Sequence, residues 1–218
     1  MRLYDTQRSG NAWKVRLLAG LVGVDLARVT LSIDRGDLRE PAFLARNPLG
    51  LVPVLELEDG RTIAESLAIL HHLAVGTPFW STAPFEQAQV LTWLSFEQAQ
   101  HMHPLAQLRL RLALHRDRRA DDGDMVAIRT QALEALALLD RQLARQGRDG
   151  WVATPDRPSI ADVALYPYSR LAPMGGIDVE SFPHLAAWLA RVEKLPGYQP
   201  LFPGRPDLNF ATAELREL

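Results

Sequence analysis

One stretch, residues 47–70, constrains the fold of this chain of 218 residues more than any other. Within it, Pro53 opens a mainly apolar run at 54–57, which is typical of a short β-strand. Proline has no backbone N–H to donate to a sheet, so Pro53 belongs at the start of a strand or on an edge strand. A turn rich in polar residues follows at 58–61, and we expect a helix to begin near Glu65.

The end of this stretch is suited to holding a small anionic or zwitterionic ligand. Glu65 and Ser66 stand where the helix is expected to begin, and the first N–H groups of a helix have no partner within it. The helix dipole adds positive potential at the same end. A simpler interpretation is that Glu65 only complements that dipole, as an acidic residue in a first helical turn does.

The chain divides into an alternating front part and a helical rear part. The front part predicts strands at 2–4, 26–33, 53–57 and 61–63, and helices at 10–22, at 41–46 and from 65 onward. The rear part predicts long helices at 85–115, 125–145 and 182–194, and a capping box that begins at Ser159 and ends at Asp162. We expect a domain at 1–76 with one sheet covered by helices, a linker at 77–84 and an all-helical domain at 85–218.

Composition excludes several classes of protein. The formal net charge of −2 gives no global field that favours nucleic acid or an anionic membrane. The chain has no cysteine, so disulfides, thiolate-bound zinc and a protein thiol nucleophile are excluded. His101 and His103 are two apart and point to different helix faces, so no shared metal is expected. No signal peptide or membrane span is visible, which favours a cytoplasmic location.

The stretch 47–70 resembles the glutathione-binding segment of cytosolic glutathione transferases, in which the Val-Pro bond is cis and the Glu-Ser pair holds the γ-glutamyl end of glutathione. Residues 158–166 resemble the buried capping-box helix of that family, and 182–198 resemble its next helix. Trp93 with 96–98 resembles a bacterial, serine-type, theta- or nu-like subset. The resemblance covers nearly the whole chain and implies an N-terminal thioredoxin-like domain followed by a C-terminal all-helical bundle domain.

The resemblance assigns Ser9 to the catalytic hydroxyl position, with Asn11 as a second donor. A thiol of pKa about 8.5 is mostly protonated at pH 7, and only the thiolate attacks well. A donor to the sulfur near a helix N-terminus favours the anion, so Ser9 is a donor and not a nucleophile. The alternative is that Ser9 merely caps the first helix.

The resemblance also implies which residues hold glutathione, a co-substrate here. Its backbone is expected to pair with Val52 as an added strand. The expected contacts are Arg39, Leu51, Val52, Pro53, Glu65, Ser66 and, reaching across a homodimer interface, Gln98. For Gln98 the alternative is an exposed polar helix face.

Two positions depart from the family pattern. Leu38 stands where close members often carry His or Gln, and Leu51 where they often carry Lys or Gln. Leucine cannot donate a hydrogen bond to the glycine carboxylate of glutathione, so Arg39 or Arg35 is needed instead. We therefore expect weaker glutathione binding than in a typical member, or a shifted ligand preference.

An apolar pocket for the electrophile is expected between the two domains. The candidates are Trp13, Met102, Pro104, Leu105, Leu108 and Phe210, although a helical apolar stripe often forms core instead. Ala99 replaces the aromatic residue usual in the subset, which leaves the substrate open.

The leading hypothesis is a homodimeric glutathione transferase that conjugates the thiolate of glutathione to small hydrophobic electrophiles, as in detoxification. The alternatives are a glutathione-dependent disulfide reductase and a non-catalytic interaction module. A maleylacetoacetate-isomerase role is less favoured, because the Ser-Ser-Cys signature of that branch is replaced by Arg8-Ser9-Gly10. No metal, nucleic acid or membrane partner is expected.

Overall fold

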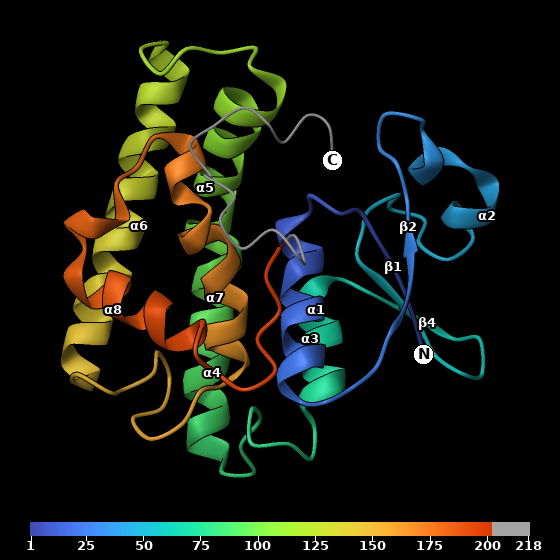
Figure 1. Ribbon diagram of the computed structural model, residues 1–218, viewed down its shortest axis with the longest axis horizontal. Coiled ribbons are helices and arrows are strands. Elements are labelled where there is room, and N and C mark those ends of the chain that lie inside the picture. Colours follow the sequence, from blue (N-terminus) through green and yellow to red (C-terminus); the bar gives the residue numbers. More distant parts are fainter. Residues whose placement is uncertain (202–218) are drawn as a thin grey trace. The chain divides into compact units, whose positions relative to one another are not determined.

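The computed structural model describes residues 1–201 and forms two compact units. The first contains residues 1–77 together with 196–201, and the second contains residues 78–195 (Figure 1). A small mixed sheet with helices followed by an all-helical unit is the expected fold class, which is confirmed.

The sheet of the first unit has four strands in the order β2-β1-β3-β4. The strands are β1 (Arg2–Asp5), β2 (Ala27–Thr30), β3 (Val54–Glu56) and β4 (Thr62–Ala64). β1 pairs in parallel with β2, while β3 is antiparallel to both β1 and β4. Leu3 and Leu55 lie opposite each other at the centre, and both are fully buried. Pro53 directly precedes β3, at the start of a strand, where its missing N–H costs no sheet hydrogen bond.

The helices of the first unit are α1 (Gly10–Leu21), α2 (Pro41–Leu44) and α3 (Ser66–Ala74), with a 3-10 turn, η1, at Asp37–Arg39. α1 packs against α3, side by side in Figure 1. The buried Leu17, Leu18, Ile69 and Leu70 supply the apolar faces of these two helices. Burying such side chains stabilises the unit by roughly 1.5–3 kcal/mol each.

The end of the described chain belongs to the first unit rather than to the helical one. The indole Nε1 of Trp13 donates to the backbone carbonyl of Gln199 at 2.7 Å. A Cβ at Gly20 would lie 2.3 Å from the carbonyl oxygen of Gly197, so only glycine permits this close approach. The segment 196–201 therefore returns to α1.

The second unit begins with one continuous helical run over residues 84–115, as expected for 85–115. It comprises α4 (Pro84–Phe96), the π-helical segment η2 (Glu97–His101), α5 (Met102–Leu108) and a second π-helical segment, η3 (Arg109–His115). Pro104 follows η2 and cannot donate to the carbonyl of Gln100, and its ring would clash with that carbonyl in an α-helix. The wider π turn just before it relieves this conflict.

The remaining helices complete the unit. They are α6 (Gly123–Gln146), α7 (Ile160–Arg170), the 3-10 turns η4 (Ala172–Gly175) and η5 (Val179–Ser181), and α8 (Pro183–Val192). The capping box of α7 is confirmed, with the Ser159 hydroxyl and the Asp162 carboxylate in their reciprocal roles. Among the described helices, none combines the length and apolar character that crossing a membrane requires.

Candidate active site

Strand pairing brings three parts of the predicted site to one end of the sheet. Tyr4 of β1 lies opposite Val54 of β3, and Val54 lies opposite Ala64 of β4. Because β3 runs antiparallel to both neighbours, the chain leaves β1 and β4 at the same end at which it enters β3. The loop to Ser9, the residue Pro53 and the residue Glu65 therefore gather at this end, which we call the β3 entry end.

Ser9 stands at the N-terminus of α1 and caps it. Its Oγ accepts a hydrogen bond from the backbone N–H of Ala12 at 3.1 Å, so the capping interpretation is confirmed. This bond uses an oxygen lone pair and leaves the hydroxyl proton for another acceptor. Over residues 1–201, no recorded hydrogen bond takes that proton. Ser9 can thus cap the helix and donate to an anion at the positive end of its dipole.

Asn11 follows in the first turn of α1. Its Oδ1 is buried and has no hydrogen-bond partner among the described residues. A buried polar atom without a partner is uncommon in folded proteins and costs about 1–3 kcal/mol. The described residues leave this acceptor oxygen unsatisfied, while the Nδ2 group of the same amide is the part that can donate to an anion.

The loop before β3 presents its backbone at the entry end. The Val52–Pro53 peptide bond is cis, as the family resemblance implies. Within the described part of the chain, no hydrogen bond uses the N–H or the C=O of Val52. These two groups are therefore free to pair with an extended peptide ligand.

Asn47 fixes this loop, a role that our sequence analysis missed. Its side chain is buried, its Nδ2 donates to the carbonyl of Leu51 at 2.8 Å, and its Oδ1 accepts from the N–H of Leu49 at 3.2 Å. The Asn-Pro pair at 47–48 was the available signal, since such pairs favour turns in which the Asn side chain bonds nearby backbone.

Glu65 precedes α3 with an unusual backbone conformation. Its φ is 69° and its ψ is 122°, outside the regions that residues other than glycine readily adopt. Such outliers cost on the order of 1–3 kcal/mol and concentrate at functional sites. The side chain is exposed, and no ion pair or hydrogen bond of its carboxylate occurs among residues 1–201. The fold thus holds a free carboxylate at the entry end at an energetic cost.

Ser66 follows as the first residue of α3 and is 4% exposed. Its backbone N–H is one of the groups at the helix start that lack an intrahelical partner. Together, Glu65 and Ser66 offer an acceptor for an ammonium group next to donors for a carboxylate. This combination matches the two charges of an α-amino acid end.

The two arginines expected near the glycine carboxylate of glutathione, Arg35 and Arg39, differ in whether they already form an ion pair. The guanidinium of Arg35 pairs with Asp37 at 2.9 Å, and this hydrogen bond lowers the pKa of the Asp37 carboxyl. Arg39 is exposed and has no ion pair among the described residues, and its Nη1 lies 2.8 Å from the position of a Cβ on Gly50. Of these two arginines, Arg39 is the one without an ion pair in the described part of the chain, and it lies by Gly50, the residue before Leu51.

The two leucines that depart from the family pattern have different surroundings. Leu38 packs against the buried cluster of Tyr4, Phe43 and Val54, so its side chain contributes to the core of the first unit. Leu51 is 54% exposed and adjoins the open backbone of Val52. The departure at Leu51 is therefore the one that changes the surface of the site.

A buried ion-pair group secures the loop that carries Ser9. Asp5 is the last residue of β1 and is 0% exposed, and it pairs with Arg16 of α1 and, at 3.0 Å, with Arg28 of β2. Arg16 also donates to the carbonyl of Gln7 at 3.3 Å. Burial lowers the pKa of the Arg16 guanidinium, and the attraction of Asp5 opposes that change. Sequence patterns gave no signal for this group because its members are distant along the chain.

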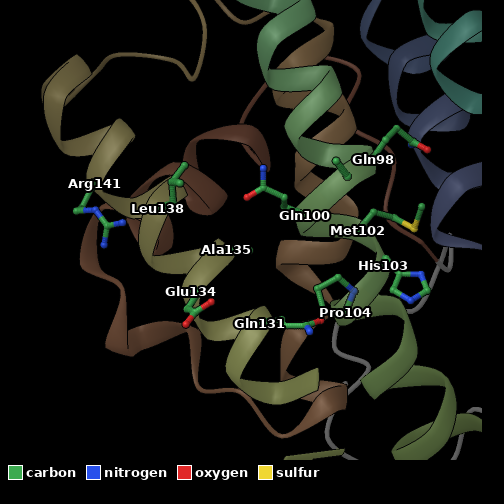
Figure 2. A pocket seen from close by; sticks show the side chains of 11 residues that line it. Gln98, Gln100, Met102, His103, Pro104, Gln131, Glu134, Ala135, Leu138 and Arg141 are labelled. Atoms are coloured by element: carbon green, nitrogen blue, oxygen red, sulfur yellow. The ribbon is translucent and has the colours of Figure 1, made fainter. Parts of the chain in front are cut away.

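The candidates from the rear part lie in the second unit. Gln98 and Met102 line a hollow of about 640 Å³ between α6 and the run from η2 to α5 (Figure 2). Gln98 is exposed and donates to Glu97 at 2.8 Å, and Pro104 also lines the hollow. Leu105 and Leu108 are 2% and 1% exposed, so they lie in the core of this unit.

Two further electrophile-pocket candidates belong elsewhere. Trp13 is 0% exposed in the core of the first unit. Phe210 lies outside the described residues. Over the described range, no group of three or more His, Asp and Glu side chains is arranged to bind a metal ion.

Comparison with known proteins relates both parts of the chain to one family. Residues 8–75 match the model described as "Glutathione S-transferase, N-terminal domain", and residues 104–196 match "Glutathione S-transferase, C-terminal domain". The chain is 32% identical to a maleylacetoacetate isomerase of Rhizobium meliloti over 93% of this chain and 96% of that protein.

Solved structures agree. A glutathione S-transferase from Pseudomonas fluorescens superimposes with a TM-score of 0.86 at 36% identity, over 92% of this chain and 98% of that one. A glutathione S-transferase from Xanthobacter autotrophicus gives a TM-score of 0.86 at 34% identity, over 93% and 97%.

Proposed function

Because the chain belongs to the glutathione S-transferase family, we propose that it is a glutathione transferase that binds glutathione at the β3 entry end and activates its thiol. The observation that carries the proposal is the convergence of three open groups at that end: the Ser9 hydroxyl, the Val52 backbone and the Glu65 carboxylate. Over the residues that the structure describes, no hydrogen bond takes the Ser9 hydroxyl proton, the N–H or C=O of Val52, or the carboxylate of Glu65.

Binding follows from the charges at the site. The ammonium group of the γ-glutamyl end faces Glu65. The carboxylate of the same γ-glutamyl end accepts hydrogen bonds from Ser66 at the start of α3. The cysteinyl backbone pairs with Val52 as an added strand. At the glycine end, Arg39 is the cation available beside Leu51.

In the proposed mechanism, catalysis depends on the glutathione sulfur lying beside Ser9 at the N-terminus of α1. The Ser9 hydroxyl donates to the thiolate, with Asn11 as a second donor, while the dipole of α1 stabilises the negative charge. Each unit by which the thiol pKa falls requires about 1.4 kcal/mol of preferential thiolate stabilisation. The thiolate then attacks an electrophilic carbon of a small hydrophobic substrate, forming a C–S bond as a leaving group departs with its electron pair.

A second candidate reaction is favoured by one comparison. The Rhizobium meliloti relative is named maleylacetoacetate isomerase, and its alignment covers nearly the whole length of both proteins. In such a reaction the thiolate adds to a conjugated double bond, the bond rotates, and elimination returns the thiolate. The same Ser9 and Glu65 arrangement serves this step, and the replaced signature at Arg8-Ser9-Gly10 is the feature against it.

The amount of glutathione consumed per molecule of product distinguishes the candidate reactions. Purified protein is incubated with glutathione and an aryl halide, a cis-configured conjugated diketo acid, or a small symmetric disulfide that contains no glutathione. A transferase consumes one glutathione per product, an isomerase consumes none, and a disulfide reductase converts two glutathiones into oxidised glutathione. Turnover with none of the three, together with unaltered ligand binding in Ser9→Ala, would favour the non-catalytic interaction module.

We also propose that the protein is a homodimer in which Gln98 of one subunit reaches the γ-glutamyl end in the other. The exposed position of Gln98 on η2 supports this role.

A further inference from the structure

α2 is too short to be stable through its own hydrogen bonds. It spans four residues, Pro41–Leu44, and buries one of them, Phe43, in a cluster with Tyr4 and Val54. Figure 1 shows α2 on the opposite side of the sheet from α1 and α3. An isolated helix of this length is not stable in water, so contacts with the sheet hold α2 in place.

Arg46, two residues after the end of α2, connects this helix to three strands. Its Nη1 donates to the carbonyl of Ala42 in α2 at 2.6 Å, and its Nε donates to Glu56 of β3 at 3.0 Å. Its Cζ lies 4.8 Å from the centre of the Tyr4 ring in β1. Its backbone carbonyl accepts from the hydroxyl of Thr62 in β4 at 3.0 Å. One residue thus attaches α2 to β1, β3 and β4.

Glu56, at the end of β3, is the partner that fixes the Arg46 side chain. Its Oε2 accepts from Arg46 and, at 3.1 Å, from the Tyr4 hydroxyl, while its Oε1 accepts from Arg2 at 3.1 Å. The hydrogen bond from Arg46 lowers the pKa of the Glu56 carboxyl, so this group is charged at neutral pH. We call Arg46, Glu56, Tyr4 and Arg2 the Arg46 network.

The network is linked through α2 to Arg39, the residue proposed for the glycine end of glutathione. Arg39 ends η1, and α2 begins two residues later. The start of η1 is attached separately, because the Asp37 carboxylate accepts from the N–H of Ser32 at 2.8 Å. Leu38 is only partly buried, against a cluster to which α2 itself contributes. The end of η1, where Arg39 stands, therefore depends on α2 and hence on Arg46.

We propose that Arg46 is a positioning residue: through α2 and η1 it holds Arg39 where the guanidinium meets the glycine carboxylate of glutathione. The inference rests on the proposed function, in which Arg39 recognises that carboxylate. The γ-glutamyl end and the thiol are held at the starts of α3 and α1 instead. Loss of the Arg46 network therefore affects recognition of the glycine end and leaves ionisation of the thiol unchanged.

Arg46→Gln tests the proposal by calorimetry. It removes the cation that pairs with Glu56, and it raises the dissociation constant of glutathione about tenfold, the loss expected when Arg39 no longer meets a carboxylate. Binding of the glycine ethyl ester of glutathione, which lacks that charge, changes by less than about twofold. The pKa of the bound thiol is also unchanged. A general disturbance of the site would weaken ester binding and alter the thiol pKa as well, and that result overturns the proposal.

The double variant Arg39→Gln/Arg46→Gln distinguishes positioning from an independent effect. If Arg46 acts through Arg39, its substitution costs nothing further once the Arg39 guanidinium is gone. The double variant then binds glutathione within about twofold of Arg39→Gln alone. Two independent losses would instead multiply to about a hundredfold, which overturns the proposal.

Arg61→Gln is the matched control. Arg61 pairs with Asp59 at 2.7 Å in the turn before β4, outside the Arg46 network. Its dissociation constants for glutathione and for the ester stay within about twofold of wild type. Glu56→Ala is the second test variant, because it removes the partner of Arg46, and it reproduces the selective loss of Arg46→Gln. The Arg46 side chain is 34% exposed, so Arg46→Gln remains folded, as circular dichroism checks.

Hydrogen exchange tests the attachment of α2 without any ligand. The N–H groups of Phe43 and Leu44 both donate to the carbonyl of Glu40, and that of Asn47 donates to Phe43. In Arg46→Gln these three groups exchange about tenfold faster or more, while those of α1 keep their wild-type rates.

The outcomes separate this inference from the proposed function. Wild-type binding of glutathione together with an Arg46→Gln protein that keeps both its exchange rates and its preference for glutathione over the ester overturns the role of Arg46 alone. A wild-type chain that does not bind glutathione overturns the proposed function and this inference with it.

Discussion

At the N-terminus of α1, the Ser9 hydroxyl combines a structural role with the proposed chemical one. It accepts from Ala12, and in the proposed mechanism it donates to the thiolate. Removing the hydroxyl therefore raises the pKa of the bound glutathione thiol by about one to two units, the equivalent of one or two charge-assisted hydrogen bonds. The ultraviolet absorbance of the thiolate, followed against pH in the complex, measures this change.

Two substitutions of Ser9 separate the roles. Ser9→Ala loses both the hydroxyl and the cap, which costs about 1 kcal/mol in unfolding free energy, whereas Ser9→Gly retains the cap to within a few tenths. Both variants show the same rise in thiol pKa if the hydroxyl is the donor. An unchanged thiol pKa in Ser9→Gly contradicts the catalytic role and leaves only the cap.

Arg39 is predicted to recognise the glycine carboxylate that Leu51 cannot bind. Arg39→Gln weakens glutathione binding about tenfold, since a charge-assisted contact is lost. The same substitution leaves binding of the glycine ethyl ester of glutathione unchanged, because the ester lacks that charge. Arg35→Gln is the matched control, as Arg35 already pairs with Asp37. If Arg39→Gln weakened the binding of glutathione and of its ester equally, Arg39 would not contact the glycine carboxylate.

The positive φ of Glu65 predicts a conflict between stability and binding. Glu65→Gly relieves the strained backbone and raises the free energy of unfolding by about 1 kcal/mol, yet it weakens glutathione binding tenfold or more. Arg116, the other described non-glycine residue with positive φ, lies at 55° in a surface loop. Arg116→Gly changes stability without affecting binding. Denaturant unfolding measures the stability of each variant, and calorimetry measures its glutathione binding. A Glu65→Gly protein that still binds glutathione like wild type refutes the functional interpretation.

At the scale of single elements, α7 depends on one buried carboxylate. Asp162 accepts from the N–H groups of Val152 and Ser159, from the Ser159 hydroxyl and from the indole of Trp188. Burial raises the pKa of Asp162, and these hydrogen bonds oppose the rise. Asp162→Asn turns one acceptor oxygen into a donor facing other donors and lowers the free energy of unfolding by about 2–4 kcal/mol.

Asp140 provides the comparison for Asp162. It accepts from the N–H groups of His184 and Leu185 through one oxygen, Oδ1, which asparagine retains. Asp140→Asn therefore costs about 1 kcal/mol or less. Urea unfolding measures the loss of unfolding free energy in each variant. Equal losses would show that the four hydrogen bonds of Asp162 stabilise the protein no more than the two of Asp140.

Most elements follow from local sequence, and each exception has an identifiable physical cause. The helix after Ser159 and the strand after Pro53 begin where capping and proline rules place them. The π segments before and after α5 were not predicted, because periodicity alone does not distinguish one extra residue in a helical turn. The conformation of Glu65 was not predicted either, since a strained backbone contradicts local preference and survives only through its surroundings.

At the scale of the molecule, the fold class was predicted from the change of rhythm near residue 77. The return of 196–201 to the first unit was not, because a bond such as that from Trp13 to Gln199 joins residues far apart in the chain. The site was predicted from two strings, the stretch 47–70 and the segment around Ser9, and the antiparallel pairing of β3 explains why Ser9, Pro53 and Glu65 meet. The packing of the partly buried Leu38 against the core likewise could be seen only in the tertiary structure.

The central claim is that the β3 entry end binds glutathione. Calorimetric titration of the purified protein with reduced glutathione, alongside the variant Glu65→Ala/Ser66→Ala, tests it most directly. We expect saturable binding of one glutathione per chain and no detectable binding by the double variant. Absence of binding to wild type at millimolar glutathione, or equal binding by both proteins, would contradict it.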